Sequence, residues 1–570
     1  MKKYFTVLQI IAIMVIMFGS NSLVAQSNEL VVYASANGAP NFLNEVIADN
    51  PGFDVYKLVS RDTCYLFSGT ITADSDFEIV GELDPATNRP PTIQPYELGD
   101  GSVPGTLFNF VGEGTTATIS DLYLLSRSNN NTQNLPDAIA IIVAADNITL
   151  NLNNCVFDSW AQFAIGYSGN WDKFFIEDCH FRNMVHPTQW YVGEVIRNMW
   201  PGTVYTDTLS MVNNTMFCVN GYAAAPVTKY YMKYFQFEHN TVAYTFKNPF
   251  FIFNATDAKV NDNIFYANWA GGSSKAEMPW WDQLWSPEVG SVIDLDTLNV
   301  AKDSVFAPDL VAEANMRMLA EARRTIDVKN NAYFWPQSIT DMWTEWNTSA
   351  ASDDSIYTHT WMNERTTNMF ADDVTWPGLD ESGNLDADPG FDNTVTGVVL
   401  QDQNGLKDWF ELCRGNNLAT AIWGFGITEP TGDPGWVPAW PVPENLAYTN
   451  TSLQTAGSNG LPVGDLNWFP NVTGVEDTEE LPSEFNLANN YPNPFNPSTN
   501  INFTIPSTGE VSLKIYDVMG REIKTVLEAS QQSAGTYNYS VNMNGFASGI
   551  YFYSLQHNGN IQTKKMMLLK

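Results

Sequence analysis

Leu152-Asn153-Asn154-Cys155-Val156-Phe157 and, 24 residues later, Ile176-Glu177-Asp178-Cys179-His180-Phe181 decide the fold of this 570-residue chain. Both hexads follow one pattern: an apolar residue, any residue, then Asn, Asp or His, two further residues, and an apolar or aromatic residue. Successive copies are 33, 24, 36, 25, 23 and 68 residues apart, which is the sign of a repeat architecture. The other copies are Ile119–Leu124, Val212–Phe217, Phe237–Val242, Val260–Phe265 and, degraded, Val328–Tyr333.

A spacing near 24 residues suits one coil of a right-handed parallel β-helix, and a longer spacing suits a coil with a loop insertion. Neighbouring coils lie about 4.8 Å apart, so equivalent side chains form ladders. We expect Phe157, Phe181 and Phe217 to lie in one column and the turn asparagines to hydrogen-bond along the stack. On this alignment Cys155 and Cys179 share a rung with Thr215, as free thiols rather than as a disulfide.

Two further stretches of sequence indicate where the stack is interrupted and where it ends. A tryptophan-rich insertion at about 270–375 interrupts the repeat, and within it Asp309–Arg324 has helical spacing. Asp388-Pro389-Gly390-Phe391 resembles the Asp-Pro-x-Phe segment found after the last coils of secreted, pectate-lyase-like right-handed β-helix proteins, although Gly390 replaces the usual bulky residue. The expected fold class is therefore all-β, with a right-handed parallel β-helix over residues 26–470.

The N-terminus has the order of a secretory signal peptide. Lys2 and Lys3 precede an apolar run over 4–18, and small residues end at Ala25. The run is shorter than the roughly 20 residues that a membrane-crossing helix needs. We therefore expect Sec export to the periplasm, cleavage after Ala25, and a mature chain without a transmembrane segment.

Charge and cysteine content exclude other classes of protein. The chain has 63 acidic and 28 basic residues and a net charge of −35, which argues against a nucleic-acid partner. Its five cysteines are few and odd in number, so a disulfide framework is not expected.

The last part of the chain has a different pattern. An acidic linker without periodicity is expected over 471–485. Beyond it, 500–505, 511–516, 537–541 and 550–555 alternate apolar with polar residues and are separated by glycines. Short strands at this spacing predict a small antiparallel β-sandwich of the immunoglobulin-like kind over 486–570.

Specific motifs in this region carry a resemblance to a known family. They are Tyr491-Pro492-Asn493-Pro494-Phe495, Val511–Asp517 with Gly520-Arg521, Gly549-Ile550-Tyr551, and Lys564-Lys565. In this order they resemble the type A C-terminal sorting domain of the type IX (Por) secretion system. The resemblance implies export across the outer membrane by the type IX machinery and removal of the domain by its C-terminal signal peptidase. The protein would then be attached to the outer-membrane surface or released.

The sequence signals for functional sites in the β-helix are less specific than the motifs of the C-terminal region. Flat indole faces over an acidic scaffold favour carbohydrate binding, although packing is the commoner role for any one tryptophan. The candidates are Trp280, Trp281, Trp285, Trp335, Trp343 and Trp346. Asp380, Asp386 and Asp388, with Glu381, are candidate ligands for Ca²⁺, which prefers hard oxygen donors.

Three functions remain open at this point. The first is a surface β-helix protein that contacts polysaccharide and has no demonstrable catalytic motif. The second is a polysaccharide lyase or glycoside hydrolase, which should place carboxylates beside Arg or Lys in one groove along the stack. The third is an adhesin or structural surface protein, so whether the chain is an enzyme stays open.

Overall fold

The computed structural model divides the chain into two compact units, one ending at Phe469 and one that contains the C-terminal β-sandwich. It describes residues 28–34, 41–59, 64–128, 135–189, 192–199, 204–225, 232–250, 252, 255–274, 291–295, 324–357, 359–392, 405–414, 438–469, 486–487, 490, 493, 495–505, 509–532, 535–557 and 560–569.

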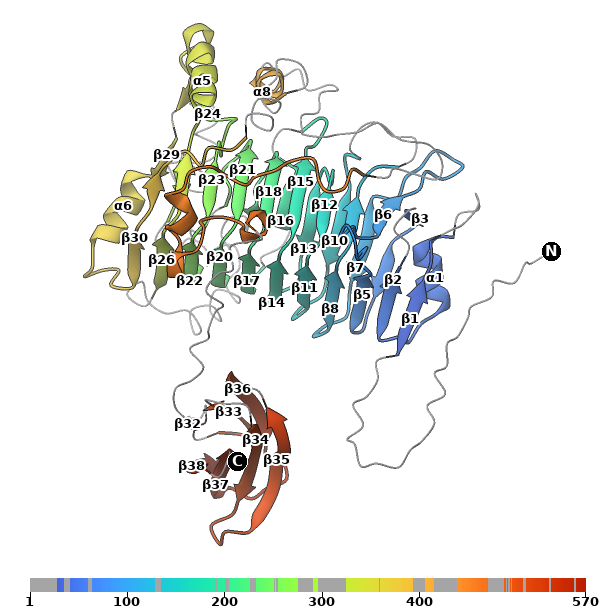
Figure 1. Ribbon diagram of the computed structural model, residues 1–570, viewed down its shortest axis with the longest axis vertical. Coiled ribbons are helices and arrows are strands. Elements are labelled where there is room, and N and C mark those ends of the chain that lie inside the picture. Colours follow the sequence, from blue (N-terminus) through green and yellow to red (C-terminus); the bar gives the residue numbers. More distant parts are fainter. Residues whose placement is uncertain are drawn as a thin grey trace, which may run out of the picture. The chain divides into compact units, whose positions relative to one another are not determined.

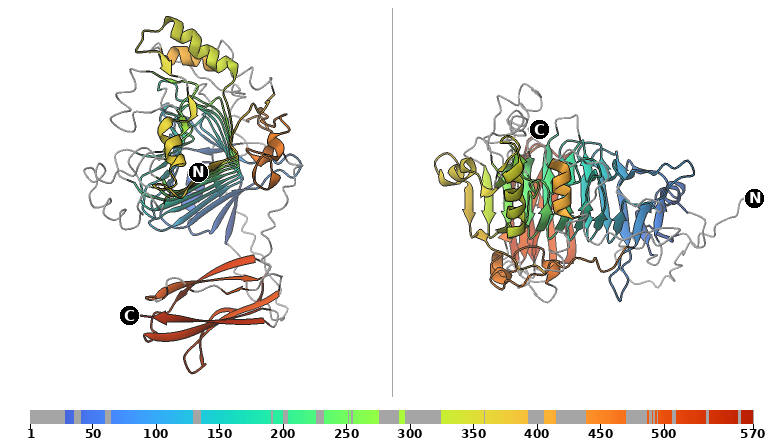
Figure 2. Two further views of the ribbon diagram at one scale, coloured as in Figure 1. Left: turned by 90° about the vertical axis from the view of Figure 1, so that its left-hand side faces the viewer. Right: turned by 90° about the horizontal axis from the view of Figure 1, so that it is seen from above.

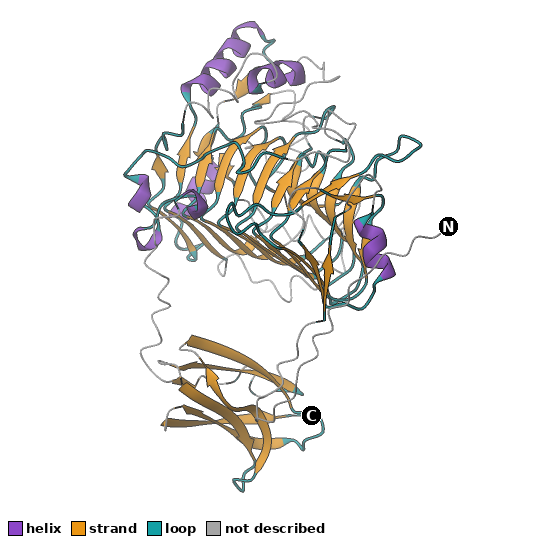
Figure 3. Ribbon diagram, turned by 45° about the vertical axis from the view of Figure 1, so that its right-hand side comes forward, coloured by secondary structure: helices purple, strands orange, loops and turns teal. Residues whose placement is uncertain are grey.

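The larger unit is a stack of coils built from three parallel sheets (Figures 1 and 3). Among the described residues, sheet A has eleven strands: β1 (Glu29–Val32), β2 (Val55–Leu58), β5 (Phe77–Gly81), β8 (Thr116–Ser120), β11 (Thr149–Asn153), β14 (Asp172–Glu177), β17 (Thr206–Val212), β20 (Met232–Glu238), β22 (Ala255–Asn261), β26 (Thr325–Lys329) and β30 (Leu379–Ser382).

Sheets B and C complete each coil. Sheet B contains β3 (Tyr65–Phe67), β6 (Thr92–Pro95), β9 (Tyr123–Leu125), β12 (Val156–Asp158), β15 (His180–Met184), β18 (Thr215–Val219), β21 (Thr241–Thr245), β23 (Ile264–Tyr266), β27 (Ala332–Phe334) and β31 (Leu385–Asp386). Sheet C contains β4 (Ile71–Ala73), β7 (Thr106–Phe110), β10 (Ile139–Val143), β13 (Phe163–Tyr167), β16 (Glu194–Asn198) and β19 (Ala224–Ala225). The chain passes from A to B to C, and the stack is a right-handed parallel β-helix, which confirms the predicted architecture.

The main core lies inside the stack, and the view along the stack in Figure 2 shows the sheets surrounding it. Equivalent apolar residues of successive coils pair in register and are almost fully buried. In sheet A one such column is Ile119, Leu152, Ile176, Met211, Phe237, Val260 and Val328. These are the first positions of the predicted hexads, with one exception.

The exception is the hexad predicted to start at Val212, which is one residue out of register. Met211, not Val212, pairs with Ile176. In sheet B, Phe157 and Phe181 do stack, with ring centroids 4.8 Å apart, but Met216 takes the next inward position and Phe217 pairs with Arg182 instead. The prediction failed because Met and Phe are both acceptable core residues, so apolar pattern alone could not distinguish the two registers.

An asparagine ladder fills the turn between sheets A and B. Asn214 accepts from the backbone N–H of Cys179, and the side chains then bond coil to coil at 2.9–3.1 Å through Asn240, Asn263, Asn331 and Asn384. Cys155 and Cys179 precede these residues at the same turn and are buried free thiols, as predicted. Their rung is shared with Asn214 rather than Thr215, because of the same register error.

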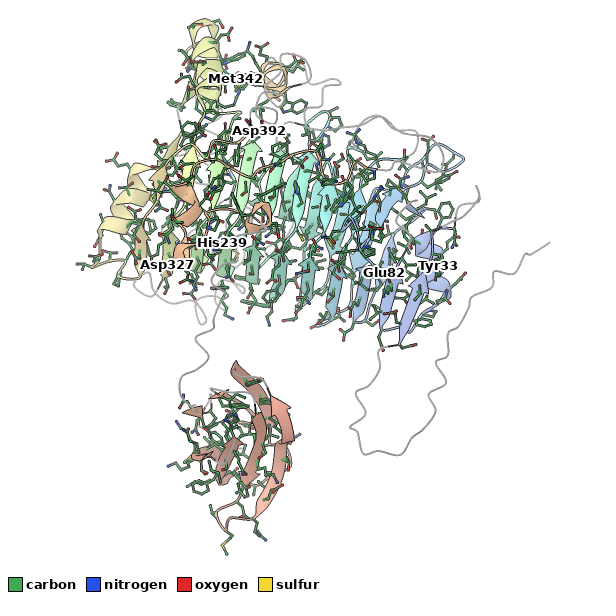
Figure 4. All side chains as sticks on the ribbon, in the orientation of Figure 1. Tyr33, Glu82, His239, Asp327, Met342 and Asp392 are labelled. Carbon is green, nitrogen blue, oxygen red and sulfur yellow. The ribbon has the colours of Figure 1, made fainter. Side chains whose placement is uncertain are left out.

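The backbone conformation of the turn explains why the third position of the hexad is polar. One residue at each of these turns adopts a left-handed conformation, which Asn and Asp tolerate better than most side chains. The φ values lie between 49° and 61° at Asp121, Asn154, Asp178, Asn213, His239, Asp262 and Asn330, and His239 is labelled in Figure 4.

Helices close the ends of the stack and extend one side. α1 (Leu43–Asp49) buries Leu43 and Ile47 beside β3 and β4. α6 (Glu364–Ala371), whose first turn is capped by the Asn363 side chain at 2.8 Å, packs against β30. In the interruption, α5 (Gln337–Ser349) carries the buried Met342, which is labelled in Figure 4. There β24 (Ser273–Ser274) pairs with β28 (Ile356–Tyr357), and β25 (Ser291–Ile293) pairs with β29 (Thr360–Met362). α8 (Leu406–Arg414) lies near α5, and the predicted helix Asp309–Arg324 lies outside the described residues except for Arg324.

The smaller unit is an antiparallel β-sandwich. One sheet contains β32 (Asn486–Leu487), β33 (Ser498–Ile505) and β36 (Gly535–Asn542), and the other contains β34 (Gly509–Tyr516), β35 (Glu522–Gln532), β37 (Gly549–His557) and β38 (Asn560–Leu568). Alternate apolar residues of both sheets form its core. The four predicted strands correspond to β33, β34, β36 and β37, and β32, β35 and β38 were missed.

Candidate functional site

A cluster of buried charged side chains lies on the outer face of sheet B. Because Phe157 and Phe181 point into the core, their strand neighbours point outward. Asp158 pairs with Arg182 across β12 and β15, and Tyr123 of β9 lies one coil earlier. Three successive coils therefore bring a phenol, a carboxylate and a guanidinium together.

Arg182 is the centre of this cluster and is 2% exposed. Its Nη1 lies 2.5 Å from Asp158 Oδ2, which also accepts from the Tyr123 hydroxyl at 2.6 Å. Its Nε and Nη2 donate to the two oxygens of Glu444 at 2.6 and 2.9 Å. His180 Nε2 lies 2.8 Å from the same carboxylate. A fork-to-fork pair of this kind is a strong, geometrically specific interaction.

Burial and charge oppose each other at these carboxylates. Burial would raise the pKa of Glu444, but the charge of Arg182 and the His180 hydrogen bond outweigh it and lower that pKa to about 2. The same competition, decided by Arg182 and the Tyr123 hydroxyl, lowers the pKa of Asp158. Both carboxylates are therefore ionised at neutral pH.

Glu444 comes from a segment far away in the sequence, residues 438–469, which we call the strap. The strap crosses the outer face of sheet B in Figure 1 and contains the short 3-10 turns η2 (Leu453–Thr455), η3 (Ser458–Gly460) and η4 (Leu466–Trp468). At one end, Trp440 and Val442 pack on Tyr123, Leu125 and Val156.

The other end of the strap docks two coils further along. Asp465 accepts from the Thr215 hydroxyl at 2.6 Å, and Trp468 Nε1 donates to the same hydroxyl at 2.8 Å. Gly464 lies so close to the sheet that a Cβ there would be 2.7 Å from Thr241 Oγ1 and 2.9 Å from Ile264 Cδ1. Burial raises the pKa of Asp465 to about 7.

A second buried carboxylate lies at the start of β16 in sheet C. Glu194 is fully buried and its Oε1 accepts from Arg197 Nη1 at 2.9 Å, whereas its Oε2 has no hydrogen-bond partner among the described residues. Burial raises the pKa of Glu194 to about 7, and the charges of Arg197 and Lys247 offset this only in part. Lys247 lies over the ring of Tyr222. This is an ionisable group near neutral pH beside two cations.

The structure gives the candidate tryptophans packing contacts. Trp343 is 4% exposed, and its Nε1 donates to the Ala270 carbonyl at 2.9 Å. Trp335 and Trp346 are partly buried and donate to the carbonyls of Asn268 and Asp354. Trp280, Trp281 and Trp285 lie outside the described residues.

The candidate calcium ligands lie on different strands. Asp380 is on β30 in sheet A and pairs with Lys329 at 2.8 Å, whereas Asp386 is on β31 in sheet B. Asp388 accepts from the Gly390 N–H in a turn. No group of three or more His, Cys, Asp or Glu side chains that could hold a metal is found in the described part of the chain.

Sequence reasoning did not find Arg182, Glu444 or Glu194. Arg182 directly follows the inward-facing Phe181 in the sequence, which places it on the outer face of the strand but does not show that it is buried. Glu444 left none, since it lies in a proline-rich loop 262 residues from its partner. Glu194 follows Gly193, and nothing in the local pattern shows that it is buried.

In the C-terminal sandwich, Asn493, Phe495, Gly549, Tyr551, Lys564 and Lys565 lie on or beside the neighbouring strands β37 and β38. Asn493 donates to the Lys565 carbonyl at 3.3 Å and accepts from the Met567 N–H at 3.0 Å. Phe495 bridges Leu568 and is 2% exposed. The Tyr551 hydroxyl donates to the Ala547 carbonyl, and Gly549 begins β37. Lys564 and Lys565 lie on β38, and Tyr491, Pro492 and Pro494 lie outside the described residues.

This segment matches a family model described as secretion system C-terminal sorting domain, over residues 489–569. Residues 489–569 are a type IX sorting domain. The sorting domain implies interaction with the type IX machinery and export to the cell surface or the medium. No curated protein and no solved structure matches the chain. Within the described residues, no helix is long and apolar enough to cross a membrane.

Proposed function

We propose that the protein is a surface or secreted β-helix protein that contacts polysaccharide. The carrying observation is a row of outward side chains on sheet A that recur at one register. Thr118, Asn151, Phe175, Ser210 and Gln236 pair in succession. Ser210 is buried and donates to Gln236 at 3.1 Å, whereas Thr118, Asn151, Phe175 and Gln236 are partly exposed. The exposed hydroxyl and amide groups and the aromatic ring recur at intervals of about 4.8 Å per coil, which suits a hydroxyl-rich chain with apolar C–H faces.

A glycan array with the full chain tests this proposal, followed by titration of any glycan that binds. Phe175→Ala should weaken binding about three- to tenfold, because a stacked ring contributes roughly 0.5–1.5 kcal/mol. Tyr357→Ala removes an exposed aromatic elsewhere and should have no effect. The absence of any glycan signal, or equal losses in the two variants, would reject the proposal and favour an adhesin or structural role.

A second candidate, a polysaccharide lyase or glycoside hydrolase, is favoured by Glu194. Its carboxyl is fully buried, has one oxygen without a partner among the described residues, and lies beside Arg197 and Lys247; burial raises its pKa to about 7, which suits a proton-transferring group if a substrate can reach it. If the protein cleaves glycan, Glu194→Gln should reduce release of unsaturated or reducing ends by about 100-fold or more. The matched change at an exposed carboxylate, Glu113→Gln, should leave the rate unchanged. Cleavage that is insensitive to Glu194→Gln would remove this residue from the chemistry.

A further inference from the structure

Exposed apolar side chains of the C-terminal sandwich gather at one end of its larger sheet. Among the described residues of the sandwich, the large hydrophobic side chains that are exposed are Val518, Met519, Ile550, Ile561 and Leu569. Val518 and Met519 lie in the turn after β34, Ile550 lies at the start of β37, and Leu569 follows β38. The antiparallel register brings these three strand ends together, and it places Ile561 at the opposite end.

The outer face of the same sheet continues this apolar surface. Tyr516 and Phe552 pair across β34 and β37, and they face outward because their buried strand neighbours point into the core. Ile550 pairs with Met567 across β37 and β38, one outward row closer to the end of the sheet. All four side chains are at least partly exposed. We give the name terminal face to the surface formed by Tyr516, Val518, Met519, Ile550, Phe552, Met567 and Leu569.

The turn that presents Val518 and Met519 is held in one conformation. The Asp517 side chain accepts from the backbone N–H groups of Met519 and Arg521 at 2.9 and 3.0 Å, and from Arg521 Nε at 2.8 Å. The Asp517 N–H donates to the Arg521 carbonyl, and the Gly520 N–H donates to the Asp517 carbonyl, both at 3.0 Å. Apolar side chains on an ordered turn lose less conformational entropy when a partner binds them than side chains on a flexible loop would.

We infer that the terminal face is the surface through which the sorting domain docks on a protein of the type IX machinery, with Val518 and Met519 entering an apolar pocket of that protein. These two side chains are 66% and 79% exposed. Contiguous exposed apolar surface on a soluble domain marks an interaction site. The partner follows from the family match, because a sorting domain implies interaction with the secretion machinery. The inference does not depend on glycan binding by the β-helix.

The charge of the sandwich indicates what surrounds the partner's pocket. Lys565 pairs with Phe552 at the border of the terminal face, is exposed, and makes no ion pair with the described residues. Residues 486–570 contain six Lys or Arg and four Asp or Glu, whereas the whole chain has a net charge of −35. A pocket with an acidic rim would therefore attract the sorting domain and repel the rest of the chain.

The first test is pulse-chase export of the full chain from a bacterium with a type IX secretion system, with periplasm and medium compared by immunoblot. The double variant Val518→Ser with Met519→Ser should reduce the amount outside the cell at early times by about tenfold or more, because two apolar side chains lose their burial in the pocket. Lys565→Glu should reduce it by about threefold. Ile561→Ser is the matched control, since Ile561 is 62% exposed at the opposite end, and it should be exported like the wild type.

The second test is photo-crosslinking in the same cells, with a photo-reactive amino acid at Met519 or at Ile561 of the full chain. The probe at Met519 should form a cross-link to a component of the type IX machinery, identified by mass spectrometry, and the probe at Ile561 should not. Because both positions are exposed, the chains with probes should unfold in urea like the wild type. This test decides the inference even if the double serine variant is less stable than the wild type.

Normal export of the double variant, or an equal loss of export in Ile561→Ser, would overturn the inference. A cross-link from Met519 to a second copy of this chain would assign the terminal face to self-association and would also overturn it. Neither result would affect the proposed function, because no glycan takes part in these experiments.

Discussion

Asn240 shows how one side chain holds neighbouring coils together. Its amide donates to Asn263 and to the Met211 carbonyl, and its oxygen accepts from Asn214. Asn240→Ala would leave buried partners unsatisfied and should lower the free energy of unfolding by about 2 kcal/mol, measured by urea denaturation. Asn153→Ala, at an exposed position on sheet A, should cost less than about 0.5 kcal/mol. Equal costs would contradict the ladder's role.

The Glu444 carboxylate gives the fold an acid-sensitive contact. Its folded pKa of about 2 lies below the ordinary value of 4.5, so its contribution is present above about pH 4.5 and is lost as the pH falls from there toward 2. The loss is of the order of 3 kcal/mol in the wild type. In Glu444→Gln the unfolding free energy should vary less over this range. Parallel pH profiles for the two proteins would show that the pair with Arg182 does not stabilise the fold.

At the scale of elements, the sheet A to sheet B turn depends on backbone conformation. Asn154 is exposed and has a φ of 49°. Asn154→Val should cost about 1–2 kcal/mol, because a β-branched residue is strained in the left-handed region, whereas Asn154→Gly should cost much less. Thermal unfolding of the two variants measures the difference. A valine variant as stable as the glycine variant would show that φ does not explain the hexad's third position.

The strands that could be predicted belong to coils in which a short turn connects sheet A to sheet B. The hexad spans the end of an A strand, this turn and the start of a B strand, so it is visible from Ile119 onward. The two coils before it have longer connections there, from Leu58 to Tyr65 and from Gly81 to Thr92, and they left no hexad. In the sandwich, β35 was missed because 522–532 does not alternate as cleanly as the four strands that were predicted.

At the scale of the whole molecule, the predicted stack and sorting domain are present, but the charged cluster was not foreseeable. It needs Glu444 to meet Arg182, 262 positions earlier, and the strap that carries Glu444 is also held by Asp465 on Thr215, 250 positions earlier. Local patterns carry no information about such contacts, which arise only once the strap folds back over the sheet. The same applies to Trp343, whose sequence context suggested a surface ring, whereas its indole is buried and donates to the Ala270 carbonyl.

The sorting domain at the C-terminus should carry the β-helix out of the cell. This expectation is tested by expressing the full chain, and the chain lacking residues 486–570, in a bacterium with a type IX secretion system. Periplasm, outer membrane and medium are then compared by immunoblot. The full chain should appear at the surface or in the medium, and the truncated chain should be retained in the periplasm. Equal amounts of both proteins outside the cell would contradict the account.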